Sequence, residues 1–123
     1  MKILLVEDDS FLRDICIKKL AKAGFLVFET ADGDQVLKNL EKIEPDIILL
    51  DILLPTVNGF EVLEKIRSDK NSKIRQTPVI VLSNLGQDED IKKAISLGAN
   101  DYLIKAHFTI EEIVGKIKNR LGL

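Results

Sequence analysis

The stretch Ile47-Ile48-Leu49-Leu50-Asp51 is a run of four apolar residues that ends in a single acid. A run this short and this apolar is typical of a strand that is buried on both faces of a sheet. Two more runs of the same kind are Ile3 to Val6, which is followed by Glu7, and Val79 to Leu82, which is followed by Ser83. All three runs predict central strands whose carboxyl ends carry polar side chains.

Two further runs, Leu26 to Glu29 and Tyr102 to Ile104, complete a set of five predicted strands. Stretches of helical periodicity separate the strands, and Thr109 with Glu112 predicts a capping box at the start of the last one. By analogy with other doubly wound folds, this alternation predicts an α/β protein with a five-stranded parallel sheet in the order 2-1-3-4-5 and helices on both faces. The predicted apolar stripes are Leu12, Ile15, Cys16 and Leu20; Val36, Leu37, Leu40 and Ile43; Phe60, Leu63 and Ile66; Ile91, Ala94 and Ile95; and Ile110, Ile113, Val114, Ile117 and Leu121.

The composition restricts the class of protein. With 123 residues, of which 46% are hydrophobic, the chain is long enough for one core, so we expect a single domain over residues 1–123 with no output domain. The net charge of -2 argues against direct binding of nucleic acid. A single cysteine, Cys16, excludes an internal disulfide, and the apolar run at Ile3 to Val6 is too short for a signal peptide or a membrane span. We therefore expect a cytoplasmic protein without membrane contact.

Polar side chains of complementary chemistry follow four of the predicted strands. Asp8 and Asp9 come just after the first strand, Asp51 follows the third, Ser83 the fourth and Lys105 the fifth. The carboxyl ends of parallel strands lie at one edge of a sheet, and in doubly wound folds this edge holds the ligand crevice between strands one and three. We therefore expect these side chains to surround one site.

The predicted site has an excess of negative charge. Each close pair among Asp8, Asp9 and Asp51 costs about 4 kcal/mol at a separation of about 4 Å and an effective dielectric constant of about 20. A hard divalent cation such as Mg²⁺ offsets this repulsion and takes phosphate oxygens as further ligands. Lys105 can pair with Asp51 and then with a phosphoryl oxygen, to which Ser83 can also donate a hydrogen bond. The pattern therefore favours phosphoryl transfer to Asp51 as an in-line nucleophile.

Each of these residues has an ordinary structural explanation when it is taken alone. Adjacent acids after a strand are commonly a solvated turn or a helix cap, and a lysine at a strand end is usually a solvated surface residue. The functional interpretation is favoured because independent groups of matching chemistry fall at the ends of four strands that the predicted fold places side by side.

The order of these motifs resembles the receiver domain of bacterial response regulators, and the resemblance covers the whole chain. It implies a flavodoxin-like fold. The stretches that carry it are Ile3-Leu4-Leu5-Val6-Glu7-Asp8-Asp9, similar to the first strand and acidic pair; Asp51-Ile52-Leu53-Leu54-Pro55 with Asn58-Gly59, similar to the phosphoacceptor segment; Val79 to Ser83, similar to the strand before the switch hydroxyl; and Asp101 to Lys105, similar to the strand before the family's lysine.

The resemblance also implies roles for individual residues. Asp51 is expected to be the phosphoacceptor, Asp9 a direct metal ligand and Asp8 a ligand that acts mainly through water, with the backbone carbonyl of Leu53 in the metal shell. Tyr102 falls at the place of the switch aromatic, for which a core aromatic with its hydroxyl at the rim is the alternative. The expected cofactor is Mg²⁺, for which Mn²⁺ can substitute.

The implied function is a phosphorylation-dependent switch of a two-component system. A sensor histidine kinase or a histidine phosphotransfer protein donates the phosphoryl group to Asp51. Ser83 then moves inward, Tyr102 turns, and the surface of the fourth predicted helix, the fifth strand and the last helix changes to control a downstream protein. A phosphorylation-dependent homodimer through these elements is a further implication. The chain is not expected to be an enzyme, because it only assists its own phosphorylation and dephosphorylation.

Two residues depart from the family's pattern. Ala106 follows Lys105 where the family has a proline joined by a cis bond, and a cis bond without proline costs about 3 kcal/mol. Lys105 is therefore expected either to retain strain or to be held differently. Asn84 follows Ser83 where a small residue is usual. We expect Asn84 and Ala106 to tune the rates of phosphorylation and dephosphorylation.

Three other functions fit parts of the pattern. A phosphatase of the haloacid dehalogenase type needs a second acid two residues after Asp51, where Leu53 stands. A flavodoxin-like cofactor binder needs hydroxyls and bare backbone donors where this chain has three acids that repel a phosphate. The third is a receiver-like docking scaffold that is not phosphorylated, and the two departures are its only support.

Overall fold

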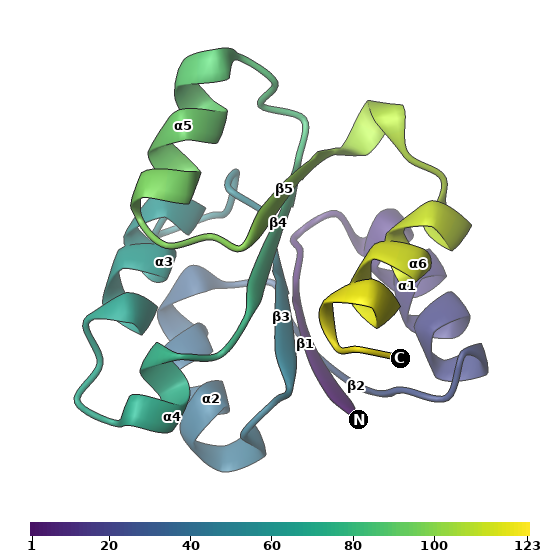
Figure 1. The fold of residues 1–123 in the computed structure, drawn as a ribbon, viewed down its shortest axis with the longest axis horizontal. Coiled ribbons are helices and arrows are strands. Elements are labelled where there is room, and N and C mark those ends of the chain that lie inside the picture. Colours follow the sequence, from purple (N-terminus) through teal and green to yellow (C-terminus); the bar gives the residue numbers. More distant parts are fainter.

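Five parallel strands form a single sheet through the middle of the molecule (Figure 1). Their bounds are β1 Lys2–Val6, β2 Leu26–Thr30, β3 Ile47–Leu50, β4 Val79–Ser83 and β5 Asp101–Ile104. The computed structural model describes all 123 residues. The strands lie in the order β2-β1-β3-β4-β5, which confirms the predicted doubly wound, flavodoxin-like topology.

The register brings the carboxyl ends of the central strands to the same level. Val6 of β1 lies opposite Leu50 of β3, and Leu50 lies opposite Val81 of β4. On the far side of β4, Ser83 lies opposite Ile104, the last residue of β5. The residues that follow these positions therefore meet at one edge of the sheet.

Helices cover both faces of the sheet (Figure 1). The first and the last helix pack on one face, and the helices between them pack on the other. The chain therefore leaves β1 toward one face and β3 toward the other, which makes the gap between these two strands the switch point. The helices are α1 Ser10–Lys22, α2 Val36–Ile43, α3 Gly59–Arg67, α4 Ser72–Arg75, α5 Asp88–Ser96 and α6 Ile110–Arg120, with 3₁₀ turns η1 Gly33–Gln35 and η2 Lys105–His107.

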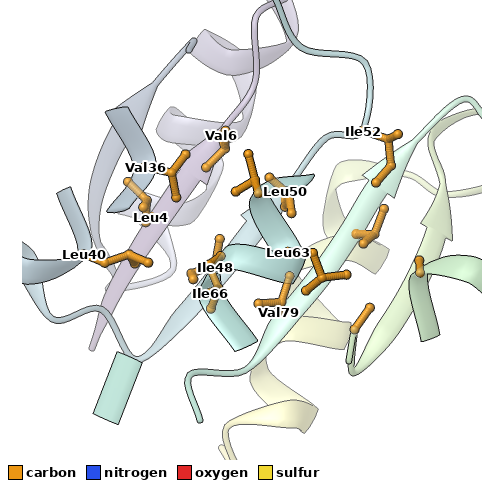
Figure 2. Close-up of a cluster of buried hydrophobic side chains, with 14 of the residues drawn as sticks. Leu4, Val6, Val36, Leu40, Ile48, Leu50, Ile52, Leu63, Ile66 and Val79 are labelled. Atoms are coloured by element: carbon orange, nitrogen blue, oxygen red, sulfur yellow. The ribbon is translucent and has the colours of Figure 1, made fainter. Parts of the chain in front are cut away.

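Two apolar cores lie on the two faces of the sheet. Successive residues of a strand point alternately into one core and into the other. Because a fully buried leucine or isoleucine contributes about 1.5–3 kcal/mol, these cores are the main source of energy that holds the polar edge in place. The core against α2 and α3, shown in Figure 2, contains Leu4, Val6, Val36, Leu40, Ile48, Leu50, Leu63, Ile66 and Val79. The core against α1 and α6 contains Ile3, Leu5, Cys16, Leu20, Ile47, Leu49, Ile80, Leu82, Ile113 and Ile117.

Local predictions at the helices are also confirmed. Thr109 Oγ1 accepts from the N–H of Glu112 at 3.1 Å, and the Glu112 carboxylate accepts from the N–H of Thr109 at 3.0 Å, so α6 begins with the predicted capping box. Cys16 is a free, buried thiol. None of the helices combines the length and the apolar character that crossing a membrane requires.

Three short elements, α4, η1 and η2, have no counterpart in the sequence prediction. Each spans only three or four residues, which is too short to show a helical repeat of apolar residues. The start of α4 is set locally, because the Asn71 side chain accepts a hydrogen bond from the N–H of Lys73 at 3.0 Å.

Candidate functional site

Three carboxylates meet where β1 and β3 end. One carboxylate oxygen from each of Glu7, Asp8 and Asp51 lies within 4.8 Å of the other two. The N–H of Glu7 donates to Thr30 O at 3.0 Å, and that of Asp51 donates to Val6 O at 3.0 Å, so the hydrogen-bond ladders of the sheet continue into the site. Glu7 is 1% exposed and Asp51 is 4% exposed, whereas Asp8 faces solvent.

A single lysine links two of these acids. The Lys105 ammonium lies 2.7 Å from Glu7 Oε1 and 2.8 Å from Asp51 Oδ2. Burial alone would lower the pKa of Lys105, but its hydrogen bonds to Asp51 and Glu7 outweigh burial and raise the pKa. The chain has no cis peptide bond, so Lys105 joins Ala106 in trans and is held by two carboxylates.

Glu7 has an unusual electrostatic environment. Burial raises the pKa of Glu7 from 4.5 to about 7, the hydrogen bond from Lys105 opposes this shift, and the Asp51 carboxylate adds to it. Glu7 Oε2 accepts a hydrogen bond of 3.2 Å from the backbone N–H of Asp9. Both carboxylate oxygens of Glu7 therefore have partners within the protein.

Asp9 has a different role from the one that its position in the acidic run suggested. Asp9 Oδ1 accepts hydrogen bonds from the N–H groups of Phe11 at 3.0 Å and Leu12 at 3.2 Å, so Asp9 is the N-cap of α1. Aspartate is one of the residues preferred at this position, where it contributes about 1 kcal/mol. Asp9 Oδ1 is thereby engaged with the start of the helix.

Glu7 takes the place in the acid cluster that the sequence analysis gave to Asp9. The cluster contains Glu7, Asp8 and Asp51, so the two acids directly after β1 belong to the site and the third acid belongs to α1. Spacing is compatible with a cap, because Asp9 lies three residues before Leu12, where the predicted apolar stripe begins, but spacing alone does not select among the three adjacent acids that precede the helix.

Ser83 and Tyr102 meet at the connection between β4 and α5. Ser83 is fully buried, and its hydroxyl accepts a hydrogen bond of 3.3 Å from the N–H of Leu85. The Tyr102 hydroxyl donates to the carbonyl of the same Leu85, and burial raises the pKa of Tyr102. Neither residue forms a hydrogen bond with the three acids, so in this structure both hold the β4–α5 connection.

The segment after Asp51 has a backbone shaped for close approach. The N–H of Leu53 donates to Asp51 Oδ1 at 3.2 Å, and the Leu53 carbonyl accepts no hydrogen bond from the protein. The N–H of Gly59 donates to Ile52 O at 2.8 Å, and a Cβ at position 59 would collide with the Asp51 carbonyl and with Ile52 Cα. A glycine is therefore required where α3 begins.

The two residues that depart from the family's pattern, Asn84 and Ala106, are both exposed. Asn84 directly follows Ser83, and Ala106 lies within η2 directly after Lys105. The Asn84 side chain forms no hydrogen bond in this structure, so it is free to respond to a group that approaches the site from solvent.

The sequence model of the Response regulator receiver domain matches residues 3–118 of the chain. The chain belongs to this family. The DNA-binding dual master transcriptional regulator RpaA of Synechocystis sp. is 34% identical over 117 residues, which cover 95% of this chain and 47% of that protein. The chain spans about half the length of the curated relatives it matches.

Two solved structures of response regulators are similar over most of this receiver domain. The phosphorylated cyanobacterial phytochrome response regulator RcpA has a TM-score of 0.83 and 32% identity, covering 95% of this chain and 90% of that chain. The Mn²⁺-bound form of response regulator Rcp1 has a TM-score of 0.82 and 27% identity, covering 95% of this chain and 91% of that chain.

As a response regulator receiver domain, the chain is a phosphoacceptor of two-component signalling rather than an enzyme of the ordinary kind. Receiver domains pair with histidine kinases. The acidic pocket of Glu7, Asp8 and Asp51 lies at the edge of the sheet where phospho-aspartate signalling requires it.

The residues present fit a hard divalent cation. The cluster offers one oxygen from each of three carboxylates, and carboxylate and carbonyl oxygens are the ligands that Mg²⁺ and Ca²⁺ accept. One lysine balances only part of this charge. The unpaired carbonyl of Leu53 and the solvent-facing carboxylate of Asp8 supply donors that do not have to give up a partner in the protein.

Proposed function

We propose that this receiver domain accepts a phosphoryl group on Asp51 and thereby controls a partner protein. The observation that carries the proposal is the environment of the Asp51 carboxylate. It is 4% exposed, it is paired with Lys105 at 2.8 Å, and it shares a cluster with two further acids. The similar response regulator RcpA has been solved in its phosphorylated form, which supports the same chemistry here.

The proposed metal ligands are Asp8, Asp51 and the carbonyl of Leu53. Glu7 is the third carboxylate of the acid cluster and adds negative charge beside them. Mg²⁺ is the proposed resident ion, with Mn²⁺ as a substitute, since the similar regulator Rcp1 has been solved in a Mn²⁺-bound form. When bound, the cation neutralises charge on the phosphoryl oxygens. Asp9 is not included, because its carboxylate caps α1.

The phosphoryl donor is a phosphohistidine of a sensor kinase or of a histidine phosphotransfer protein, which we place in the cytoplasm. An Asp51 carboxylate oxygen forms a bond to phosphorus while the phosphorus–nitrogen bond of the donor breaks, and the imidazole leaves with the electron pair. Lys105 exchanges one of its carboxylate partners for a phosphoryl oxygen. The Ser83 hydroxyl donates a hydrogen bond to a second phosphoryl oxygen.

The proposed output begins at Leu85. Its N–H donates a hydrogen bond to the Ser83 hydroxyl, and its carbonyl accepts one from the Tyr102 hydroxyl. When the hydroxyl of Ser83 turns to the phosphoryl group, the hydrogen bond that Leu85 N–H donates to it is lost. The β4–α5 connection is then free to rearrange, and with it the surface of α5, β5 and α6 that a downstream protein or a second phosphorylated copy would recognise.

Intact mass after incubation with acetyl phosphate tests the proposal. We expect a gain of one phosphoryl group that requires Mg²⁺ and is lost in Asp51→Asn. Asp46→Asn is the matched control, because Asp46 stands directly before β3 as Asp51 stands directly after it, and its mass gain should equal that of the native chain. A gain that persists in Asp51→Asn would contradict the acceptor, and no gain at all would favour the docking scaffold.

Asn84 and Ala106 are proposed to tune the rates of this reaction. Asn84→Ala removes an exposed amide beside Ser83, and Ala106→Pro installs the residue that is usual in the family. Loss of the phosphoryl mass with time in the presence of Mg²⁺, after acetyl phosphate has been removed, gives the dephosphorylation rate of each variant. If both variants lose the group at the native rate, the proposed tuning role is wrong.

A further inference from the structure

Arg13 lies beside the acid cluster without belonging to it. It is the fourth residue of α1, and only 19% of its side chain is exposed. Its Nη1 donates a hydrogen bond of 2.8 Å to the backbone carbonyl of Glu7. Its Nε lies 3.8 Å from Glu29 Oε2 on β2 and, although buried, has no hydrogen-bond partner.

This arrangement is costly for a residue that only packs. A buried N–H without a partner costs about 1–3 kcal/mol, and a largely buried guanidinium needs compensation for its lost hydration. An apolar side chain at this position of α1 would avoid both costs. An incompletely satisfied buried group therefore calls for an explanation, and the one short contact of Arg13 points to the backbone of Glu7.

The carbonyl that Arg13 contacts belongs to the peptide group between Glu7 and Asp8. The other side of Glu7 is fixed by the sheet, since its N–H donates to Thr30 O at 3.0 Å. Asp8 itself forms no hydrogen bond within the chain, in either its main chain or its side chain. The hydrogen bond from Arg13 is therefore the contact that sets the orientation of the Glu7–Asp8 peptide plane.

We infer that Arg13 is a positioning residue for the divalent-cation site: by holding the Glu7 carbonyl it sets how the carboxylates of Glu7 and Asp8 lie relative to each other. The inference rests on the proposed function, because it takes the acid cluster to hold a cation. Groups that orient metal ligands from outside the coordination sphere contribute about 10–100-fold to metal affinity.

If Arg13 acted only through its charge, its removal would change the affinity for Mg²⁺ in the opposite direction. The guanidinium is a cation close to a cation site, so its removal strengthens the attraction of the cluster for Mg²⁺ if charge alone matters. Removal weakens binding if the hydrogen bond to the Glu7 carbonyl is what matters. The direction of the change in affinity separates the two roles.

Isothermal titration of the unphosphorylated full chain with Mg²⁺ measures this direction. We expect Arg13→Met to raise the Kd for Mg²⁺ by about tenfold. Arg13→Lys should raise it by about threefold, because an ammonium can donate to the Glu7 carbonyl but lacks the rigid planar fork. With acetyl phosphate as donor, the Mg²⁺ concentration for half-maximal phosphorylation should rise in parallel, while the rate at saturating Mg²⁺ stays within about twofold of the native rate.

Two control variants separate Arg13's contact with Glu7 from its other properties. Glu29→Gln removes the 3.8 Å ion pair on β2, and Lys19→Gln removes another α1 cation, which is paired with Glu111 at 3.1 Å. Both should leave the Kd for Mg²⁺ within about twofold of the native value, since neither change removes the hydrogen bond from Arg13 to the Glu7 carbonyl or a carboxylate of the acid cluster. A loss of affinity in Glu29→Gln equal to that in Arg13→Met would overturn the inference.

An unchanged or lower Kd in Arg13→Met would also overturn it. If Arg13→Met does not fold, as judged by thermal unfolding, Arg13→Lys decides by the same criterion: a raised Kd supports the positioning role and an unchanged or lower Kd rejects it. A native chain that binds no divalent cation would overturn the proposed function and the role of Arg13 together. Native binding with unaffected Arg13 variants would reject the role of Arg13 alone.

Discussion

Two polar clusters lie at opposite edges of the sheet and are built in opposite ways. At the carboxyl edge, three acids lie together, and Lys105 pairs with two of them, Glu7 and Asp51. At the amino edge, the guanidinium of Arg67 at the end of α3 faces only neutral acceptors. Its four hydrogen bonds go to Gly98 O at 2.9 Å, Arg75 O at 2.9 Å, Thr77 O at 2.7 Å and Asn100 Oδ1 at 3.0 Å.

The difference separates a stabilising cluster from a binding cluster. Charge-assisted hydrogen bonds to carbonyls join the ends of α3, β4 and β5 without like-charge repulsion. The acid cluster has unbalanced negative charge and contains Glu7, whose pKa burial raises to about 7. Such features are typical of functional sites that bind a ligand. We therefore expect changes at the amino edge to alter stability and changes at the carboxyl edge to alter chemistry.

The largest effect is expected from Arg67→Met. It leaves three backbone carbonyls without their donor, while Asn100 Oδ1 keeps the hydrogen bond of 2.8 Å from the Val79 N–H, so the free energy of unfolding in urea should fall by about 3 kcal/mol. Phosphorylation of the folded variant should remain native in extent. Arg75→Met is the matched control, because the Arg75 side chain makes one short hydrogen bond, to Asp69 O at 2.9 Å, and should cost about 1 kcal/mol. A loss of phosphorylation in folded Arg67→Met would show that the two edges are coupled.

A smaller effect is expected from pH in metal-free buffer. The pKa of Glu7 rises from 4.5 to about 7 on folding, so the native state binds this proton more tightly. The stability that it contributes is fully present below about pH 4.5 and is lost as the pH rises through about 7. The free energy of unfolding should therefore fall between pH 5 and 8, by on the order of 2 kcal/mol from this group.

Glu7→Gln tests the assignment of this pH dependence, because glutamine does not titrate. Urea unfolding in EDTA should show a flatter dependence of stability on pH in the variant than in the native chain. An equally steep dependence in Glu7→Gln would mean that another group is responsible.

The smallest effect is expected from Asp8→Asn. Asp8 is exposed and without a partner in the protein, so removing its charge relieves repulsion and should stabilise the metal-free chain by about 0.5–1 kcal/mol. The stabilisation of the native chain by added Mg²⁺ should be lost in the variant, because a ligand stabilises only what it binds. Asp14→Asn on α1 is the control and should change neither quantity. A destabilised Asp8→Asn chain would contradict the view that the cluster is maintained for binding.

The strands themselves were predictable because the buried runs are short and apolar, and their order followed from analogy with other doubly wound folds. Asp51 and Lys105 could be placed together from this pattern, since parallel strands bring their carboxyl ends to one edge. The Leu53 carbonyl was assigned to the metal shell only by the resemblance to receiver domains, not by the pattern of apolar and polar residues. The helix α4 was not predictable, because one turn of helix leaves no periodic signal.

The sequence by itself determined which segments are strands and which edge of a parallel sheet carries the chemistry, because apolar runs alternate with helical stretches and end in polar residues; the strand order came from analogy with doubly wound folds. Only the tertiary structure decided how Glu7 and Asp9 are divided between the site and the cap of α1. It also revealed Arg13 at the Glu7 carbonyl and Arg67 at the opposite edge. The physical reason is that the role of a polar side chain depends on its hydrogen-bond and charge partners. Those partners belong to segments that only folding brings together.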